Sequence, residues 1–232
     1  MKLNKREIEE IDINFNQIIL DSSFLKSSIQ YSLTEDILNV FYENLFQIIK
    51  QKSKVKIGYS FFPEDEIEKS KNRIIIDGKP LSVGDIIYRN LRKTESIFII
   101  TCTIGAEIEK IIRKFFDSGN YIEGYTLDLL ASELVELSAD YLQDFIEKKF
   151  SNSQIGFSNR YSPGYCGWPV SDQKILFSLL PDNFCGIKIT ENSLMLPIKS
   201  ISGILAVGKN INKLEYECDI CDDSFCYKKR KL

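Results

Sequence analysis

Hydrophobic residues recur every three or four positions along several stretches of the chain, which is the spacing of one face of an α-helix. The pattern is longest over residues 121–150, where leucines and aromatic residues recur in this way and acidic residues repeat on another face. We therefore expect a long amphipathic helix there. Further helices are expected over residues 34–52, 85–92, 106–116 and 171–180, together with a short charged helix that begins near Asn4.

Other stretches alternate hydrophobic and polar residues or are continuously hydrophobic, as strands are. The strands predicted in this way cover residues 54–62, 73–76, 80–83, 96–103, 186–190 and 201–207. Asp77 and Gly78 separate the second and third of them and form a dipeptide typical of a tight hairpin turn. Helices and strands follow one another without a regular βαβ rhythm. We therefore expect an α+β fold, in which a twisted, largely antiparallel sheet is flanked by helices.

The composition indicates a globular protein. Of the 232 residues, 44% are hydrophobic and 27% are charged, which is enough to fill a sizeable core. We expect one domain over residues 1–210 and a cysteine-rich tail over residues 211–232. The net charge of −3 provides no positive field for nucleic acid or a membrane surface. No hydrophobic run approaches the roughly 20 residues that span a bilayer, and the N-terminus lacks a signal-peptide core, so we expect a cytoplasmic protein with no nucleic-acid or membrane partner.

The chain contains no histidine. This excludes Ser-His-Asp and Cys-His nucleophiles, imidazole metal sites and every general-base scheme that depends on imidazole. Any chemistry must therefore come from carboxylates, thiols, lysine, arginine, tyrosine or a bound cofactor.

Residues 159–169 have an unusual composition. They combine an arginine, three large aromatic residues, two glycines and two prolines within eleven residues. A guanidinium group beside aromatic rings, on a backbone that proline stiffens and glycine opens to close approach, suits a small ligand with a carboxylate and a flat base. The alternative is a well-packed surface loop whose aromatic residues belong to the core.

The spacing Arg160-x-x-x-Gly164-Tyr165-x-x-x-Pro169 resembles the signature of the activation domain of cobalamin-dependent methionine synthase, which binds S-adenosylmethionine during reductive remethylation of the cobalamin. Two further blocks resemble the same family. One is residues 186–203, with a Thr-Glu pair, a proline and a Ser-x-Ser-Gly sequence, and the other is residues 131–144. The blocks keep the family's order, and the likeness covers roughly residues 55–207. It implies the fold of that activation domain.

The resemblance also implies a set of ligand contacts. In the family, the motif arginine and tyrosine and a helix glutamate contact S-adenosylmethionine, and these positions match Arg160, Tyr165 and Glu136. Hydrogen bonds from the loop backbone are expected around Ser162 and Gly164. By its position alone, Glu136 would be one member of a solvated acidic row on its helix. The ligand has a carboxylate for arginine, positive groups for carboxylates and an adenine for an aromatic ring.

Several features depart from the family pattern. A further acidic contact near the family's N-terminus has no assigned counterpart, although Asp12 and Asp21 lie in the right region, and Val170 and Ser171 stand where the family commonly has an acidic residue and a histidine. The 232 residues contain no cobalamin-binding module. The resemblance therefore implies a free-standing domain that acts in trans on a corrinoid methionine synthase or methyltransferase subunit, with a flavodoxin- or ferredoxin-like reductant as a further possible partner.

The tail holds three closely spaced cysteines, Cys218, Cys221 and Cys226. A Cys-x-x-Cys pair with a third cysteine can occupy three corners of a tetrahedral zinc or iron–sulfur site. The fourth ligand would be one of Cys102, Cys166, Cys185 or Asp222. The alternatives are reduced cysteines without a metal, or a redox pair. The basic run at residues 228–231 is a solvated end or a contact for an acidic partner.

Two functions are consistent with these features. The first is an S-adenosylmethionine-binding reactivation component, which positions the methyl donor and needs no acid or base because the cobalamin supplies the nucleophile. The alternative is a non-catalytic binding, assembly or electron-transfer module of a corrinoid methyltransferase system, with a metal or cluster in the cysteine tail. Binding of S-adenosylmethionine that depends on Arg160 would distinguish the first from the second.

Overall fold

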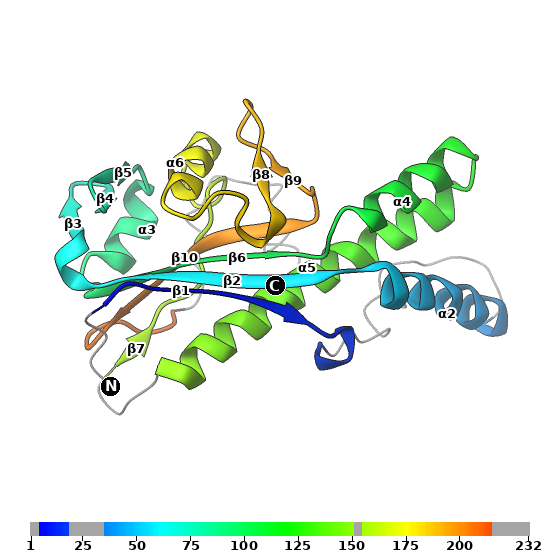
Figure 1. Ribbon diagram of the computed structural model, residues 1–232, viewed down its shortest axis with the longest axis horizontal. Helices are drawn as coiled ribbons and strands as arrows, with labels where there is room; N and C mark the ends of the chain where they lie inside the picture. The colour runs from blue at the N-terminus through cyan, green and yellow to red at the C-terminus, as the bar shows by residue number, and fades with distance from the viewer. Residues whose placement is uncertain (1–4, 19–34, 151–154, 215–232) are drawn as a thin grey trace.

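A five-stranded antiparallel sheet forms the centre of the computed structural model, which describes residues 5–18, 35–150 and 155–214 (Figure 1). In order across the sheet the strands are β1 (Glu7–Ile13), β2 (Val55–Phe62), β6 (Ser96–Thr103), β10 (Ser200–Gly208) and β7 (Gly156–Phe157). Every neighbouring pair is antiparallel. The α+β class and the antiparallel sheet predicted from the sequence are therefore confirmed.

Different elements cover the two faces of this sheet (Figure 1). One face packs against the long helix α5 (Tyr121–Phe150), and the helices α2 (Glu35–Lys52) and α4 (Glu107–Asp117) pack on α5 and share its hydrophobic core. The other carries α3 (Gly84–Leu91), α6 (Gln173–Ser178), the small sheet of β3 (Ile67–Ser70), β4 (Arg73–Ile76) and β5 (Lys79–Leu81), and the hairpin of β8 (Lys188–Ile189) and β9 (Met195–Leu196). Short 3-10 turns connect these elements: η1 (Phe15–Gln17), η2 (Glu64–Glu66), η3 (Val170–Asp172) and η4 (Phe184–Gly186).

Strand β6 explains why the sheet has a hydrophobic core on both sides. All of its residues are buried. Phe98, Ile100 and Cys102 face the core under α5, whereas Ile97 and Ile99 face the core under α3 and α6. Successive side chains of a strand point to opposite faces, so a central strand covered on both sides becomes a continuous hydrophobic run. The sequence of β6 has this pattern.

The N-terminal segment differs from the prediction. The prediction of a charged helix near Asn4 is wrong, because Glu7–Ile13 form the edge strand β1, which pairs with β2. The segment is extended because its acidic residues bind side chains that are far away in the sequence. Lys149 of α5 contacts Glu7 at 2.8 Å and Glu9 at 2.7 Å, and the hydroxyl of Tyr59 donates to both carboxylates. These contacts stabilise the extended conformation of the segment.

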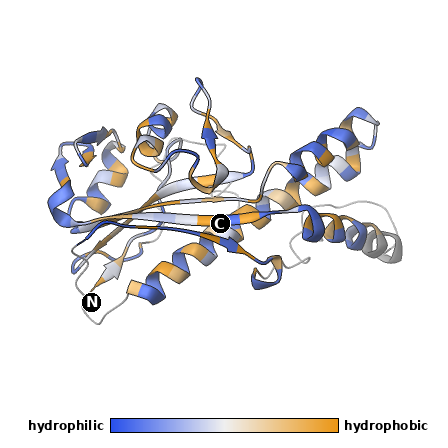
Figure 2. Cartoon of the chain, in the orientation of Figure 1, coloured by the Kyte–Doolittle hydropathy of each residue, from blue (hydrophilic) through white to orange (hydrophobic). Residues whose placement is uncertain are grey.

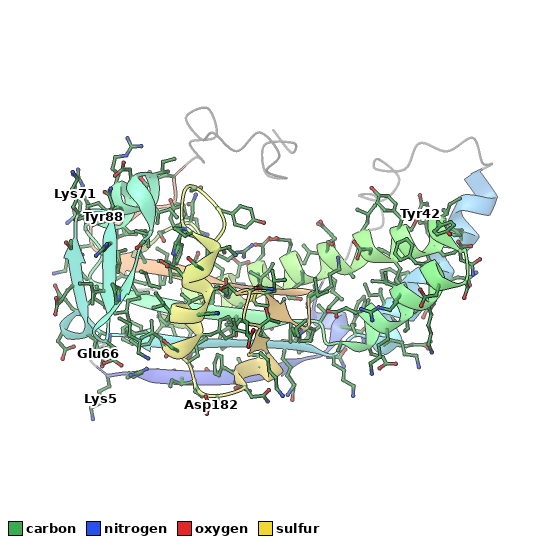
Figure 3. The ribbon with its side chains drawn as sticks, turned by 90° about the horizontal axis from the view of Figure 1, so that it is seen from above. Lys5, Tyr42, Glu66, Lys71, Tyr88 and Asp182 are labelled. Atoms are coloured by element: carbon green, nitrogen blue, oxygen red, sulfur yellow. The ribbon has the colours of Figure 1, made fainter. Side chains whose placement is uncertain are left out.

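Helix α5 has the bounds that its periodicity predicts, and its 30 residues reach about 45 Å at the usual rise per residue. Hydrophobic and hydrophilic residues alternate along α4 and α5 with the turns of each helix (Figure 2). Together α4 and the first half of α5 form an arm that projects beyond the sheet, with Tyr42 of α2 beside it (Figure 3). In the described part of the chain, no helix combines the length and hydrophobicity that crossing a membrane requires.

Candidate functional site

The loop that follows α5 continues to pair with β10 beyond the end of β7. The amide of Ser158 donates to the carbonyl of Ala206 at 2.9 Å, and Tyr161 and Ile204 exchange two backbone hydrogen bonds of 3.1 and 2.8 Å. Because side chains alternate along an extended chain, Arg160 points toward α5 and Tyr161 toward α3. The arginine of the predicted motif is thus placed between the main sheet and the long helix.

Gly203 allows the loop to approach β10 this closely. A Cβ atom at this position would lie 2.6 Å from the carbonyl oxygen of Tyr161, 2.9 Å from Ser162 Oγ and 3.3 Å from Arg160 Cγ. Such contacts are closer than packed atoms allow, so the position requires glycine. The Ser-Gly pair of one family-like block therefore supports the arginine of another.

Arg160 binds two carboxylates of α5. Its Nη2 lies 2.7 Å from Glu136 Oε2, and its Nη1 lies 3.0 Å from Asp140 Oδ1. The two acids are four residues apart and so share one face of the helix. Burial on its own would lower the pKa of Arg160, but the attraction of Glu136 and Asp140 outweighs it and raises the pKa above its ordinary value. The guanidinium therefore stays charged, and the three side chains together carry one net negative charge.

The two acids differ in exposure. The side chain of Arg160 is 7% exposed and that of Glu136 is 26% exposed, whereas Asp140 is 66% exposed. Glu136 is therefore the inner partner of the arginine and Asp140 the outer one. The structure brings together two of the predicted site residues, Arg160 and Glu136, although 24 positions separate them in the sequence.

A second ion pair lies on the same row of α5, two turns toward its N-terminus. Lys199, from the connection between β9 and β10, contacts Asp128 and Ser132 at 2.8 Å each. Four polar residues of α5, at positions 128, 132, 136 and 140, thus form a row. Lys199 contacts the first two, and Arg160 contacts the last two. Asp140 and Lys199 were not assigned to the site from the sequence; the spacing of four along the acidic row was the available signal for Asp140.

The second half of the loop is a compact turn. The amide of Gly164 donates to the carbonyl of Trp168 at 2.7 Å, and the amide of Tyr165 donates to that of Ser162 at 3.2 Å. Gly164 is exposed and has a φ of +94°, a conformation that favours glycine. The amides of Gly164 and Tyr165 are therefore used within the turn, so they are not free to bind a ligand in this conformation.

Buried contacts anchor this turn to the rest of the protein. Trp168 is buried, and its indole Nε1 donates to Asp172 Oδ2 at 3.0 Å; the same oxygen accepts from the amide of Ser82. Tyr161 is buried as well, but Tyr165 is 41% exposed. Two of the three large aromatic residues therefore belong to the core, as the alternative interpretation of the loop held, and Tyr165 presents its ring to solvent.

The predicted metal ligands of the tail, Cys218, Cys221, Cys226 and Asp222, lie outside the described residues. Of the proposed fourth ligands, Cys102 and Cys185 are buried and Cys166 is half-buried. Burial raises the pKa of Cys102 far above its ordinary value and that of Cys185 to about 12, so neither thiol readily becomes the thiolate that binds a metal. Within residues 5–18, 35–150 and 155–214, no group of three or more Cys, Asp or Glu side chains is arranged to hold a metal ion.

The N-terminal acidic contact stays unassigned. Asp12 lies on β1, is exposed and pairs with Lys56 at 3.5 Å. Asp21 lies outside the described residues.

Comparison with known proteins gives a family and a fold. Residues 64–231, well over half of the chain, match the family described as vitamin B12 dependent methionine synthase, activation domain. Among solved structures, a crystal structure of the MetH reactivation domain bound to AdoHcy is similar, with a TM-score of 0.59 and 17% sequence identity over 88% of this chain and 79% of that chain. No curated protein matches the chain. At this low identity the structural likeness establishes the shared fold, and the family match establishes that the chain belongs to the family of the activation domain of vitamin B12-dependent methionine synthase.

Proposed function

We propose that this protein binds S-adenosylmethionine and presents its methyl group to the cobalamin of a partner protein for reductive remethylation. The observation that carries the proposal is the direct contact of Arg160 with Glu136 at 2.7 Å. Both positions match ligand-contacting residues of the family, and they reach each other from different elements. The AdoHcy in the similar reactivation domain supports the same choice of ligand.

The residues of the site suit the chemistry of this ligand. Arg160 would bind its carboxylate, Glu136 would face its positive groups, and the exposed ring of Tyr165 would contact the adenine or the sulfonium. Gly164 leaves the backbone open to close approach. The net negative charge of Arg160, Glu136 and Asp140 together favours a cationic ligand over a neutral one.

The protein's own contribution would be position and charge. When bound, S-adenosylmethionine would supply an activated methyl group for transfer from its sulfonium sulfur to the reduced cobalt of the partner, with S-adenosylhomocysteine as the other product. A reductant of the flavodoxin or ferredoxin type would supply the electron that activates the cobalt. Arg160 and Glu136 would fix the ligand so that the methyl group faces the incoming cobalt, and this transfer needs no acid or base from the protein.

Calorimetry tests the proposal. We expect S-adenosylmethionine to bind with a stoichiometry of one, and Arg160→Ala to weaken binding by about 1.5–3 kcal/mol, the range for losing a hydrogen bond to a charged group. Lys149→Met is a matched control, because it also removes a cation of two ion pairs but at the far end of α5. Circular dichroism would verify that each variant folds.

Absence of binding heat up to millimolar ligand, or equal binding by the folded Arg160→Ala variant, would overturn the proposal. The alternative, a binding or electron-transfer module of a corrinoid methyltransferase system, would then be favoured. In that function Cys218, Cys221 and Cys226 would hold zinc or an iron–sulfur cluster.

A further inference from the structure

Arg160 uses different nitrogens for its two acidic partners. Nη2 binds Glu136 and Nη1 binds Asp140, with the side chain of the arginine almost shielded from water. The outer acid, Asp140, is mostly exposed. A carboxylate that reaches Arg160 from solvent would therefore meet the nitrogen that Asp140 already occupies.

Two carboxylates close to one nitrogen repel each other, so a carboxylate that binds at Nη1 from solvent would compete with Asp140. Glu136 is held more firmly, because its side chain is less exposed and its contact with Arg160 is shorter. Asp140 leaves at small cost, since an exposed carboxylate regains water when its ion pair breaks. The difference in burial between the two acids decides which of them is displaced.

We propose that Asp140 is an internal competitor for the carboxylate of the ligand. With no ligand bound, Asp140 occupies Nη1 of the buried guanidinium and holds it in place. When S-adenosylmethionine binds, its carboxylate replaces Asp140 at Nη1, while Glu136 stays at Nη2. This inference rests on the proposed function and adds to it that Asp140 lowers the affinity of the site for ligands with a carboxylate.

The effect of removing the Asp140 charge should depend on whether the ligand has a carboxylate. Asp140→Asn removes the competing charge and should tighten binding of S-adenosylmethionine about two- to fivefold, the factor that corresponds to one exposed ion pair. Decarboxylated S-adenosylmethionine has no carboxylate that competes with Asp140, so the same substitution should not tighten its binding. Asp144→Asn is the matched control: it removes an equal charge one turn further along the same row, at an exposed position.

Dissociation constants would be measured for both ligands with the wild type and the two variants, after thermal unfolding has verified that each variant folds. Asp140→Ala would serve as a second variant. Unchanged or weaker binding of S-adenosylmethionine by Asp140→Asn would overturn the inference, and so would an equal gain for the decarboxylated ligand or for Asp144→Asn. If the wild type binds neither ligand, the proposed function itself fails, which separates the two results.

Discussion

A guanidinium group that is nearly shielded from water is stable only when other groups compensate for its lost hydration. At Arg160 this compensation comes from α5, and the backbone that carries the arginine is positioned by β10. The arginine is therefore placed by two elements that belong to separate parts of the sequence. Its orientation depends on how closely the loop can approach β10, which is determined at Gly203.

Gly203→Ala tests this dependence. The added Cβ would lie 2.6 Å from the carbonyl oxygen of Tyr161, so the loop must move away from β10. We expect the free energy of unfolding to fall by about 1–3 kcal/mol, the usual cost of overpacking, and binding of S-adenosylmethionine to weaken because Arg160 shifts with the loop. Urea unfolding and calorimetry would measure the two effects.

The matched control is Gly208→Ala, at the far end of β10, where an added Cβ would come no closer than 3.2 Å to its neighbours. It should affect binding little. Wild-type stability and affinity in the Gly203→Ala variant would show that the close approach is not required.

At the scale of elements, the spacing of hydrophobic residues predicts those helices and strands whose conformation depends mainly on their own sequence. The periodicity of residues 121–150 is long enough to predict α5 with its observed bounds. The segment at residues 7–13 is short and charged, and its conformation depends on β2 and on Lys149, which are far away in the sequence. The same limit holds at the site. The resemblance to the family identifies Arg160 and Glu136 as site residues. The contact of Asp140 with Arg160 depends on the position of the guanidinium group in the folded protein, which the sequence pattern does not give.

The ion pairs between β1 and α5 should make the stability of the protein depend on pH. Hydrogen bonds from Lys149 and then Tyr59 hold the pKa values of Glu7 and Glu9 below their ordinary value of 4.5. A lowered pKa in the folded state means that the stabilisation is complete above pH 4.5 and is lost as the pH falls through the lower folded-state value.

Lys149→Met should therefore lower the free energy of unfolding at pH 7 by about 1 kcal/mol, because the groups are about one-third exposed. The difference from the wild type should shrink as the pH falls below 4.5. Urea unfolding at several pH values would measure it. A difference that stays constant down to pH 3 would show that the ion pairs contribute nothing and that Lys149 acts only through packing on nearby aromatic rings.

At the scale of the whole molecule, the sheet separates two cores, and the candidate site lies between α5 and the segment after β7 that pairs with β10. Among the side chains of the candidate site, Arg160 is buried, whereas Asp140 and Tyr165 are exposed to solvent. Family membership connects this arrangement to a cobalamin-dependent reaction. Under the proposed function, the cobalt would come from a partner protein that approaches the exposed side chains of Asp140 and Tyr165.

A reconstituted assay tests that relation. A sulfonium methyl group transfers only to a strong nucleophile brought almost into contact with it. We expect that mixing this protein with a corrinoid methionine synthase subunit, a low-potential reductant and S-adenosylmethionine converts inactive cob(II)alamin to methylcobalamin, which is visible as a change in the absorbance spectrum. The folded Arg160→Ala variant should slow the conversion at limiting S-adenosylmethionine, because it would hold the donor less tightly. If the spectrum changes equally fast without this protein, it has no role in reactivating that partner, even if it binds S-adenosylmethionine.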